Sequence, residues 1–274
     1  MSKKYFAISD IHSFYDEMLE ALKSKGFDMQ NSDHNIIICG DAFDRGEFSL
    51  KVFEFMKILN NENRLIYVRG NHEDLLFDCI DELVRYGKCG GHHYSNGTVK
   101  TLSHFINEDD YWMYSTYIPT NVIESIVNNT KELREFIQNN SKNYFTLGNK
   151  IFVHSWLPIY NYIDKGDAII EGWDDETRAL TSLWKKARWG NPFDQWREID
   201  VPEGKCFVFG HYHVSYYWSH IKQERKEFPP KNRKDWLKSF EPVILDNIIG
   251  LDACTAYSGI VNCVVFDENR DVIG

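Results

Sequence analysis

Five short motifs place carboxylate, imidazole and amide side chains at wide intervals along this chain. In order they are Asp10-Ile11-His12, the seven residues from Gly40 to Gly46, Gly70-Asn71-His72-Glu73, His154, and Gly210-His211-Tyr212-His213. Carboxylate oxygens and imidazole nitrogens are mixed hard and borderline donors, which suit a pair of divalent transition metal ions. The residue types therefore predict a metal site that is assembled from distant parts of the sequence.

Short apolar runs come before the motifs and predict strands, and runs with helical spacing come after them. Strands are expected over residues 4–9, 35–39, 64–68, 144–147, 150–154, 205–209, 244–251 and 260–266. Helices are expected over residues 14–25, 49–59, 72–86, 99–106, 118–129, 131–139 and 175–187. Alternating strands and helices predict an α/β protein whose parallel strands are covered by helices.

The candidate ligands share one position relative to the predicted strands. Six of them come directly after five of these strands: Asp10, His12, Asp41, Asn71, His154 and His211. In open α/β sheets, ligands bind beyond the carboxyl ends of the strands, so these side chains are expected on one rim. Gly40, Gly70 and Gly210 would let the backbone turn sharply where the ligands enter the site.

Composition narrows the class of protein. The 274 residues are 43% hydrophobic and 26% charged, as in an ordinary globular protein. The net charge of −10 disfavours nucleic acid and anionic membranes as partners. Six scattered cysteines without a Cys-x-x-Cys pair indicate reduced thiols, not a disulfide or zinc framework. No signal-peptide core or membrane span is recognisable, so a cytoplasmic protein is expected.

The chain reads as a single domain over residues 1–274 with two insertions. The first, at about 88–142, is expected to lie over the site, and the second, at about 214–241, is locally basic. No repeat, low-complexity stretch or linker separates these segments from the rest. The sequence does not specify an oligomeric state.

The ordered motifs resemble those of the calcineurin-like metallophosphoesterases. Within them, Asp44-Arg45-Gly46 and Gly-Asn-His-Glu at position 70 resemble the bacterial and phage phosphoprotein (serine/threonine) phosphatases, which are related to symmetrical dinucleoside tetraphosphatases. Residues 249–259 resemble the closing Asp-Thr-Gly-type segment of that family. The resemblance covers most of the chain outside the insertions. It implies a four-layer fold, a central mixed β-sandwich flanked by helices, with a dinuclear metal site at the carboxyl ends of the strands.

The resemblance implies seven metal ligands: Asp10, His12, Asp41, Asn71, His154, His211 and His213. Asp10 and His12 would hold the first metal, and Asp41 would bridge to the second. His213 is unusual for the phosphoprotein branch and resembles the wider superfamily, in which the second histidine of Gly-His-x-His binds the first metal. The cofactors implied are two divalent ions, manganese first, with iron, zinc or magnesium admitted by the same donors.

The resemblance also implies roles in catalysis and in phosphate binding. His72 would be the general acid, oriented by Asp44, and Arg45 would hold the phosphate through its guanidinium fork. A metal-bridging hydroxide would attack phosphorus in line, since the metal pair lowers the pKa of a shared water.

A second phosphate-binding group is expected from two further segments. Arg188, or alternatively Lys185 or Lys186, is the candidate after a Leu-Trp pair, although a solvated helix end would look the same. Asn96, before a glycine, resembles an element that lines the pocket of the phage enzymes. The adjacent His92-His93 pair is more often structural than in contact with substrate.

Three departures from the family pattern leave every ligand in place. Ser13 replaces a glycine after Asp-x-His, and Ala42-Phe43 precedes Asp-Arg-Gly. His154 is followed by Ser-Trp in place of Gly-Gly or Ala-Gly. The last departure leaves the shape of the pocket and the substrate open.

The function predicted is metal-dependent hydrolysis of a phosphate monoester, such as phosphoserine or phosphothreonine on a protein. The alternative is hydrolysis of a dinucleoside tetraphosphate, a phosphoanhydride, whose bases could stack on insertion aromatics such as Tyr94 and Tyr216. The partner would accordingly be a phosphorylated protein or a small phosphorylated or nucleotide substrate. A phosphodiesterase and a non-catalytic scaffold rank lower, because Arg45 suits a terminal phosphate and no ligand is missing.

Overall fold

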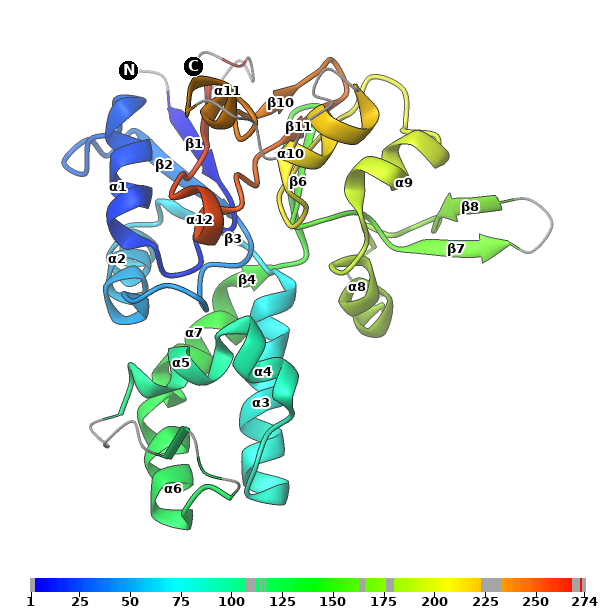
Figure 1. Cartoon of the computed structure of the whole chain (residues 1–274). Coiled ribbons are helices and arrows are strands. Elements are labelled where there is room, and N and C mark those ends of the chain that lie inside the picture. The colour runs from blue at the N-terminus through cyan, green and yellow to red at the C-terminus, as the bar shows by residue number, and fades with distance from the viewer. Residues whose placement is uncertain are drawn as a thin grey trace.

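Two five-stranded sheets form the centre of the computed structural model, which describes residues 3–106, 112–113, 115, 117–162, 166–175, 180–222, 233–267 and 272 (Figure 1). The first sheet has the order β12 (Cys263–Asp267), β1 (Lys4–Ile8), β2 (His34–Cys39), β3 (Leu65–Val68) and β4 (Ser141–Lys142). The second has the order β10 (Val243–Ile244), β11 (Ile248–Gly250), β9 (Cys206–Phe209), β6 (Lys150–Val153) and β5 (Tyr144–Leu147). Each sheet mixes parallel and antiparallel pairs.

The alternation of side chains along each strand separates three layers of core. In β1, Ala7 packs between the two sheets, whereas Phe6 and Ile8 pack outward against helices. In β9, Val208 packs between the sheets and Phe207 packs outward on the other side. Because successive side chains in a strand point to opposite faces, continuous apolar strands serve two cores at once.

Helices cover the outer face of each sheet. The first sheet is covered by α1 (Tyr15–Ser24), α2 (Ser49–Asn61), α3 (Asn71–Tyr86), α5 (Thr98–Ser103), α6 (Thr120–Asn129) and α7 (Lys131–Asn140). The second is covered by α8 (Thr181–Ala187), α9 (Pro192–Glu198), α10 (Val214–Tyr216) and the π-helix η2 (Tyr217–Ile221). Further helices are α4 (Gly91–Asn96), α11 (Arg233–Lys238) and α12 (Thr255–Ser258). The four-layer fold predicted from the sequence is confirmed.

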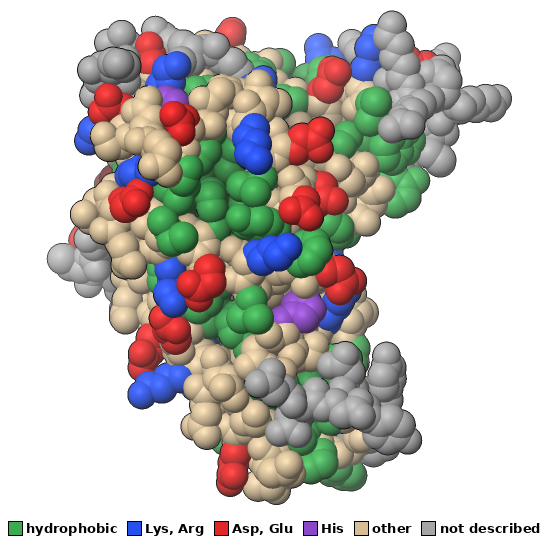
Figure 2. All heavy atoms as spheres, turned by 90° about the vertical axis from the view of Figure 1, so that its left-hand side faces the viewer, with side chains coloured by type: hydrophobic (Ala, Val, Ile, Leu, Met, Phe, Trp, Pro, Cys, Tyr) green, Lys and Arg blue, Asp and Glu red, His purple; other side chains and the backbone are tan. Residues whose placement is uncertain are grey.

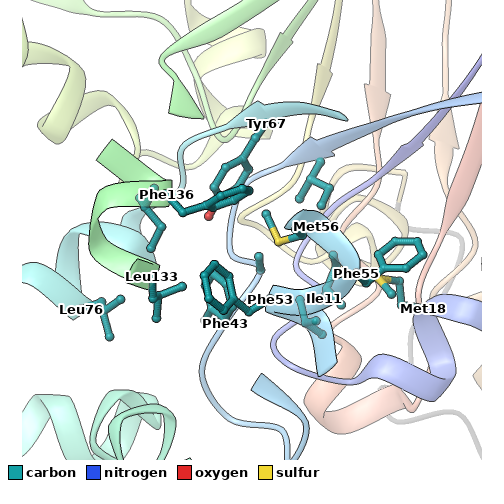
Figure 3. Packing of buried hydrophobic residues seen from close by; sticks show 14 of the residues in the cluster. Ile11, Met18, Phe43, Phe53, Phe55, Met56, Tyr67, Leu76, Leu133 and Phe136 are labelled. Carbon is teal, nitrogen blue, oxygen red and sulfur yellow. The ribbon is translucent and has the colours of Figure 1, made fainter. Parts of the chain in front are cut away.

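The segment at 88–142 shares the core of the first sheet. Phe136 of α7 packs edge-on against Phe53 of α2, with ring centroids 5.5 Å apart, and lies beside Tyr67 of β3 (Figure 3). Leu133, one turn earlier in α7, points into the same cluster. The segment ends in β4, a strand of the sheet that the sequence did not predict. Among its described helices, α4 and α5 contribute side chains at the site. The division of the chain into domains stays a prediction.

Several predicted elements differ from the structure. The helix predicted over 175–187 begins only at Thr181, and residues 176–179 lie outside the described part. The strand predicted over 244–251 is two antiparallel strands, because Leu245, Asp246 and Asn247 form a turn between β10 and β11. The hairpin of β7 (Ile159–Tyr162) and β8 (Gly166–Ile169) was not predicted. Neither was α9, although Asn191 before Pro192 is a typical helix start.

An apolar groove of about 580 Å³ lies between α1 and α2 on the outer surface. Leu50 and Ile58 line it and are 46% and 47% exposed, and hydrophobic side chains gather on this face (Figure 2). Among the described residues, no helix combines the length and the apolar character needed to cross a membrane.

Candidate metal centre

The carboxyl ends of five strands, β1, β2, β3, β6 and β9, converge on a pocket of about 90 Å³. Nine of the residues singled out from the sequence line it: Asp10, His12, Asp41, Arg45, Asn71, His72, Asn96, His211 and His213. His154 lies beneath this lining, with its Nε2 2.8 Å from Asn71 Oδ1. The convergence follows from the parallel pairing of β1 with β2, β2 with β3, and β6 with β9.

Asp41 belongs to two groups of potential ligands at once. His12, Asp41 and His72 form one group and Asp41, His154 and His211 form the other, and the donor atoms within each group lie within 4.8 Å of one another. Asp41 Oδ2 is 3.8 Å from His12 Nε2, and Asp41 Oδ1 is 3.4 Å from His154 Nε2. One carboxylate that faces two sets of donors is the arrangement a bridging ligand needs, so the donor set fits a pair of divalent ions.

Backbone carbonyls orient two of the imidazoles. His12 Nδ1 lies 2.9 Å from the Phe43 carbonyl, and His154 Nδ1 lies 2.8 Å from the Cys39 carbonyl. A proton on each Nδ1 donates to the carbonyl, which leaves Nε2 with its lone pair facing the pocket. Such outer hydrogen bonds fix the tautomer and the direction of a metal-binding histidine.

The electrostatics of the cluster favour a cation. Burial, reinforced by a neighbouring carboxylate, raises the pKa of Asp10 and of Asp41 well above the usual range. Burial lowers the pKa of His12 and His154 well below the usual range, and that of His211 to about 4. Deprotonated carboxylates would repel one another here, and a bound cation offsets that repulsion. Neutral imidazoles offer lone pairs that a cation can accept.

Backbone strain is concentrated at the site. Nine non-glycine residues among those described have positive φ, and eight of them are at or next to the motifs: Asp10, His12, Ser13, Asp41, Asp44, Arg45, His211 and Cys254. Each such residue costs on the order of 1 kcal/mol and persists only where the surroundings fix it. The strain turns side chains from separate strands toward one point.

The glycines before the ligands are required for two different reasons. Gly40 has φ +83°, so the predicted sharp turn is present there. Gly70 is extended, with φ −96° and ψ −179°, and its role is close approach: a Cβ there would lie 2.2 Å from Asp41 Oδ1. Gly210 also allows a close approach, since a Cβ added there would lie 1.7 Å from Ser9 Oγ. The turn explanation was therefore wrong for Gly70.

The side chain of Glu73 holds two loops of the site together, a role that the sequence did not indicate. Its buried carboxylate accepts hydrogen bonds from the backbone N–H groups of Gly70 at 2.7 Å, Asp41 at 3.1 Å and Ala42 at 2.9 Å. These bonds join the loop after β2 to the start of α3. The fourth position of Gly-Asn-His-Glu is thus a structural support for the ligands on both loops.

His72 is held by a chain of buried hydrogen bonds. Its Nδ1 is 2.7 Å from Asp44 Oδ2, and Thr98 and Thr101 each donate to the Asp44 carboxylate at 2.8 Å. The other nitrogen, Nε2, lies 3.3 Å from the Arg45 guanidinium. The predicted neighbours of His72 are therefore in contact with it, and two threonines from α5 complete the arrangement.

The turn at Asn96-Gly97, between α4 and α5, packs closely against the loop that carries Arg45. Asn96 lines the pocket, and its Nδ2 donates to the carbonyl of His92 at 2.8 Å. Gly97 has φ +85°, and a Cβ there would lie 2.3 Å from the backbone N of Arg45. This turn is the part of the first insertion that reaches the site.

Arg188 is not brought to the pocket. It is buried, and its guanidinium pairs with Asp74 at 2.8 and 2.7 Å and with Asn143 at 3.0 Å. Lys185, the alternative, pairs with Asp78 at 2.9 Å. The segment instead contributes Trp189, which lines the pocket and is 49% exposed.

Two pocket residues from the closing segment were not singled out by sequence. Asp252 and Cys254 line the pocket, and Asp252 is buried, which raises the pKa of its carboxyl group. Asp252 Oδ2 lies 3.9 Å from His213 Nε2. The position of Asp252 just after β11, another parallel strand end, was the signal that could have identified it.

The chain resembles known phosphoesterases in part of its sequence. It is 33% identical over 79 residues to bis(5'-nucleosyl)-tetraphosphatase PrpE [asymmetrical] of Bacillus velezensis, covering 27% of this chain and 32% of that one. It is 37% identical over 67 residues to serine/threonine-protein phosphatase SIT4 of Candida albicans, covering 23% and 21%. The chain thus matches about a third or less of the length of these relatives.

The same fold occurs in a solved structure titled as a cold-active protein tyrosine phosphatase. The TM-score is 0.50 at 15% identity, and the similarity covers 100% of this chain and 76% of that one. Residues 3–245 match the calcineurin-like phosphoesterase family, a span that contains every predicted metal ligand. The chain is therefore a member of the calcineurin-like phosphoesterase family.

Proposed function

We propose that this chain is a metal-dependent phosphatase that releases a phosphoryl group from a phosphate monoester such as phosphoserine or phosphothreonine. The observation that carries the proposal is the position of His72, which is bonded to Asp44, lies 3.3 Å from Arg45, and has its Nε2 3.8 Å from the shared carboxylate Asp41. A proton donor, a phosphate-binding cation and a metal-binding carboxylate thus meet within one pocket.

The metal ions would bind to the residues that follow the carboxyl ends of the strands. Six of the predicted ligands, all except His213, would hold two divalent ions, one toward His12 and one toward His154, with Asp41 between them. When bound, such a pair supplies Lewis acid stabilisation and a water of lowered pKa for phosphoryl transfer. Asp10 accepts the backbone N–H of His211 at 2.9 Å and so joins the two halves of the ligand set.

The remaining side chains would bind the phosphoryl group and move one proton. Arg45 offers a planar fork of donors that matches two phosphate oxygens, and Asn96 offers a neutral donor. Asp44 accepts a hydrogen bond from the N–H at His72 Nδ1, so His72 Nε2 is the atom that would give a proton to the leaving oxygen.

The pocket is too small to enclose a whole substrate. Its volume of about 90 Å³ is well below the roughly 300–1,000 Å³ of pockets that enclose a drug-sized ligand. The leaving group must therefore lie at the rim, where Trp189 is 49% and Tyr212 37% exposed.

Hydrolysis of a dinucleoside tetraphosphate is the second candidate. Two observations favour it: the PrpE relative is named for that activity, and Trp189 offers an exposed ring beside the pocket. Stacking on an aromatic side chain is worth about 1–3 kcal/mol per base. The insertion aromatics named from the sequence are placed differently, since neither Tyr94 nor Tyr216 lines the pocket.

The deciding experiment compares two substrates on metal-stripped protein as Mn²⁺ is added back. A phosphopeptide hydrolysed with higher kcat/KM than dinucleoside tetraphosphate supports the monoesterase, and the reverse order supports the phosphoanhydride hydrolase. Trp189→Ala is the matched variant: it raises KM for the nucleotide several-fold and leaves the peptide unchanged only if a base stacks there. No turnover of either substrate with any divalent metal contradicts both.

A further inference from the structure

A second group of metal-binding side chains lies away from the pocket, where α3 meets α4. Glu82 comes from α3, and His92 and His93 come from the first turn of α4, which lies beside α3 (Figure 1). One donor atom from each of the three lies within 4.8 Å of the others. None of the three lines the pocket of the metal centre.

His93 is the unusual member of this group. Its side chain is fully buried, yet neither ring nitrogen has a hydrogen-bond partner among the described residues. A buried polar atom without a partner is destabilising, so it calls for an explanation. The nearest charged group is Glu82, whose Oε2 lies 3.4 Å from His93 Nε2.

That separation suits two ligands of one ion. Ligands about 2.0–2.1 Å from a tetrahedral zinc lie about 3.4 Å from each other, close to the observed distance. The same spacing, 3.4 Å, separates His154 Nε2 and Asp41 Oδ1 in the main centre. The rings of His92 and His93 are also adjacent, with centroids 3.9 Å apart.

The loop before α4 fixes the geometry of this group. Glu82 Oε2 accepts the backbone N–H of Gly90 at 2.7 Å, which holds the carboxylate at the start of α4. A Cβ at Gly90 would lie 2.8 Å from His92 Nδ1, so the His92 ring folds back over the backbone of Gly90. The same oxygen of Glu82 can also face an ion, because a carboxylate oxygen has two lone pairs.

We propose that Glu82, His92 and His93 bind a third divalent transition metal ion of the zinc type, with water as the fourth ligand, and that this ion fixes α4 to α3. Two imidazoles and one carboxylate are a common zinc ligand set. The opposite end of α4 carries Asn96 into the pocket, so the ion would also hold Asn96 in place. The inference does not depend on which phosphate compound is the substrate.

The test counts zinc ions bound per chain after metal-stripped protein is dialysed against Zn²⁺. His92→Ala removes an exposed ligand, and Glu82→Gln keeps an oxygen for Gly90 but loses the charge. Each variant should bind one ion fewer than the wild type. His220→Ala, which removes an exposed histidine elsewhere, should bind the same number as the wild type.

A second readout isolates the proposed site from the main centre. In Asp41→Asn protein, Co²⁺ should still give the intense visible absorption of a tetrahedral site, and adding His92→Ala should abolish it. Circular dichroism checks that each variant is folded. If His92→Ala does not fold, the zinc count of Glu82→Gln decides the test. Equal zinc counts in the wild type and the folded variants would overturn the inference and leave an ion pair between Glu82 and His93.

Discussion

The two sides of the metal pocket differ in how firmly their side chains are held. On the buried side, formed by Asp41, Asp44 and His72, every side chain is at most 2% exposed and carries hydrogen bonds from neighbouring loops. On the open side, formed by His213 and Trp189, the side chains are 45% and 49% exposed. His213 has its nearest carboxylate at 3.9 Å, too far for a hydrogen bond.

This difference separates two tasks. Proton transfer and phosphate orientation need side chains held to within about 0.5 Å, which the interlocked bonds around Asp44 and Glu73 supply. A leaving group that varies in shape needs a rim that can adapt. We therefore expect substitutions on the buried side to reduce the chemical step and substitutions on the open side to change substrate binding.

The largest effect is expected from Asp41→Asn. The amide keeps the shape of the carboxylate but removes the charge that faces both ligand groups, so metal affinity should fall by at least ~100-fold and activity should be lost. Metal content and turnover are measured together. Full turnover in the variant would exclude Asp41 as the bridging ligand.

His72→Asn should lower kcat by about 10²–10⁴-fold while metal content stays close to wild type. The reason is that the asparagine cannot deliver the proton that Nε2 gives to the leaving oxygen. A substrate whose leaving group needs no protonation, such as an aryl phosphate with a very acidic phenol, should be affected much less. Equal losses for both leaving groups would argue against the acid role.

Thr101→Val should lower kcat by roughly tenfold, a smaller loss than that of His72→Asn. The hydroxyl both donates to Asp44 Oδ1 and accepts the Asp44 backbone N–H at 2.9 Å, so its removal loosens the carboxylate that orients His72. Thr101→Ser, which retains the hydroxyl, is the control and should restore most of the activity. If Thr101→Ser is as poor as Thr101→Val, packing and not hydrogen bonding is responsible.

His213→Ala tests the open side and should have a modest effect, a several-fold rise in KM with kcat little changed. Its side chain is 45% exposed and belongs to neither ligand group at Asp41. A loss of one bound metal ion, or a fall in kcat as large as that of His72→Asn, would place His213 among the ligands. It would also remove the distinction between the two sides.

Metal uptake should release protons, and more of them as pH falls toward the raised pKa values of Asp10 and Asp41. The sign follows because burial raises the pKa of both carboxyls in the metal-free fold and so favours their protonated form, whereas a cation favours the deprotonated form. Calorimetry of Mn²⁺ binding in buffers of different ionisation enthalpy measures the number of protons released. No dependence on the buffer would mean that the carboxylates are already charged.

Most of the pocket lining could be predicted because its signals are local. Asp10, Asp41 and His211 each follow an apolar strand directly, and the rule for parallel sheets then places them on one rim. The sequence singled out Gly70, but it did not indicate why a glycine is needed there. Whether a glycine serves a turn or a close contact depends on what lies opposite, here Asp41 Oδ1.

Arg188 and Trp189 illustrate what a linear motif cannot resolve. They are adjacent in sequence, yet one is buried against Asp74 and the other faces the pocket. Which of two neighbours points toward a site depends on the rotation of a helix end, and that rotation is set by partners elsewhere in the chain. The ion pair with Asp74, 114 residues away, decides it here.

The sequence by itself determined the fold class, the ends of the strands that carry the motifs, and the chemical types of the candidate ligands, because periodicity and residue type are local properties. The tertiary structure decided which donors meet: the two oxygens of Asp41 facing separate imidazoles, Glu73 tying two loops together, and His93 beside Glu82. These are distances between residues far apart in the chain or across a loop. They follow from the stacking of two sheets and the docking of helices, which pattern alone does not specify.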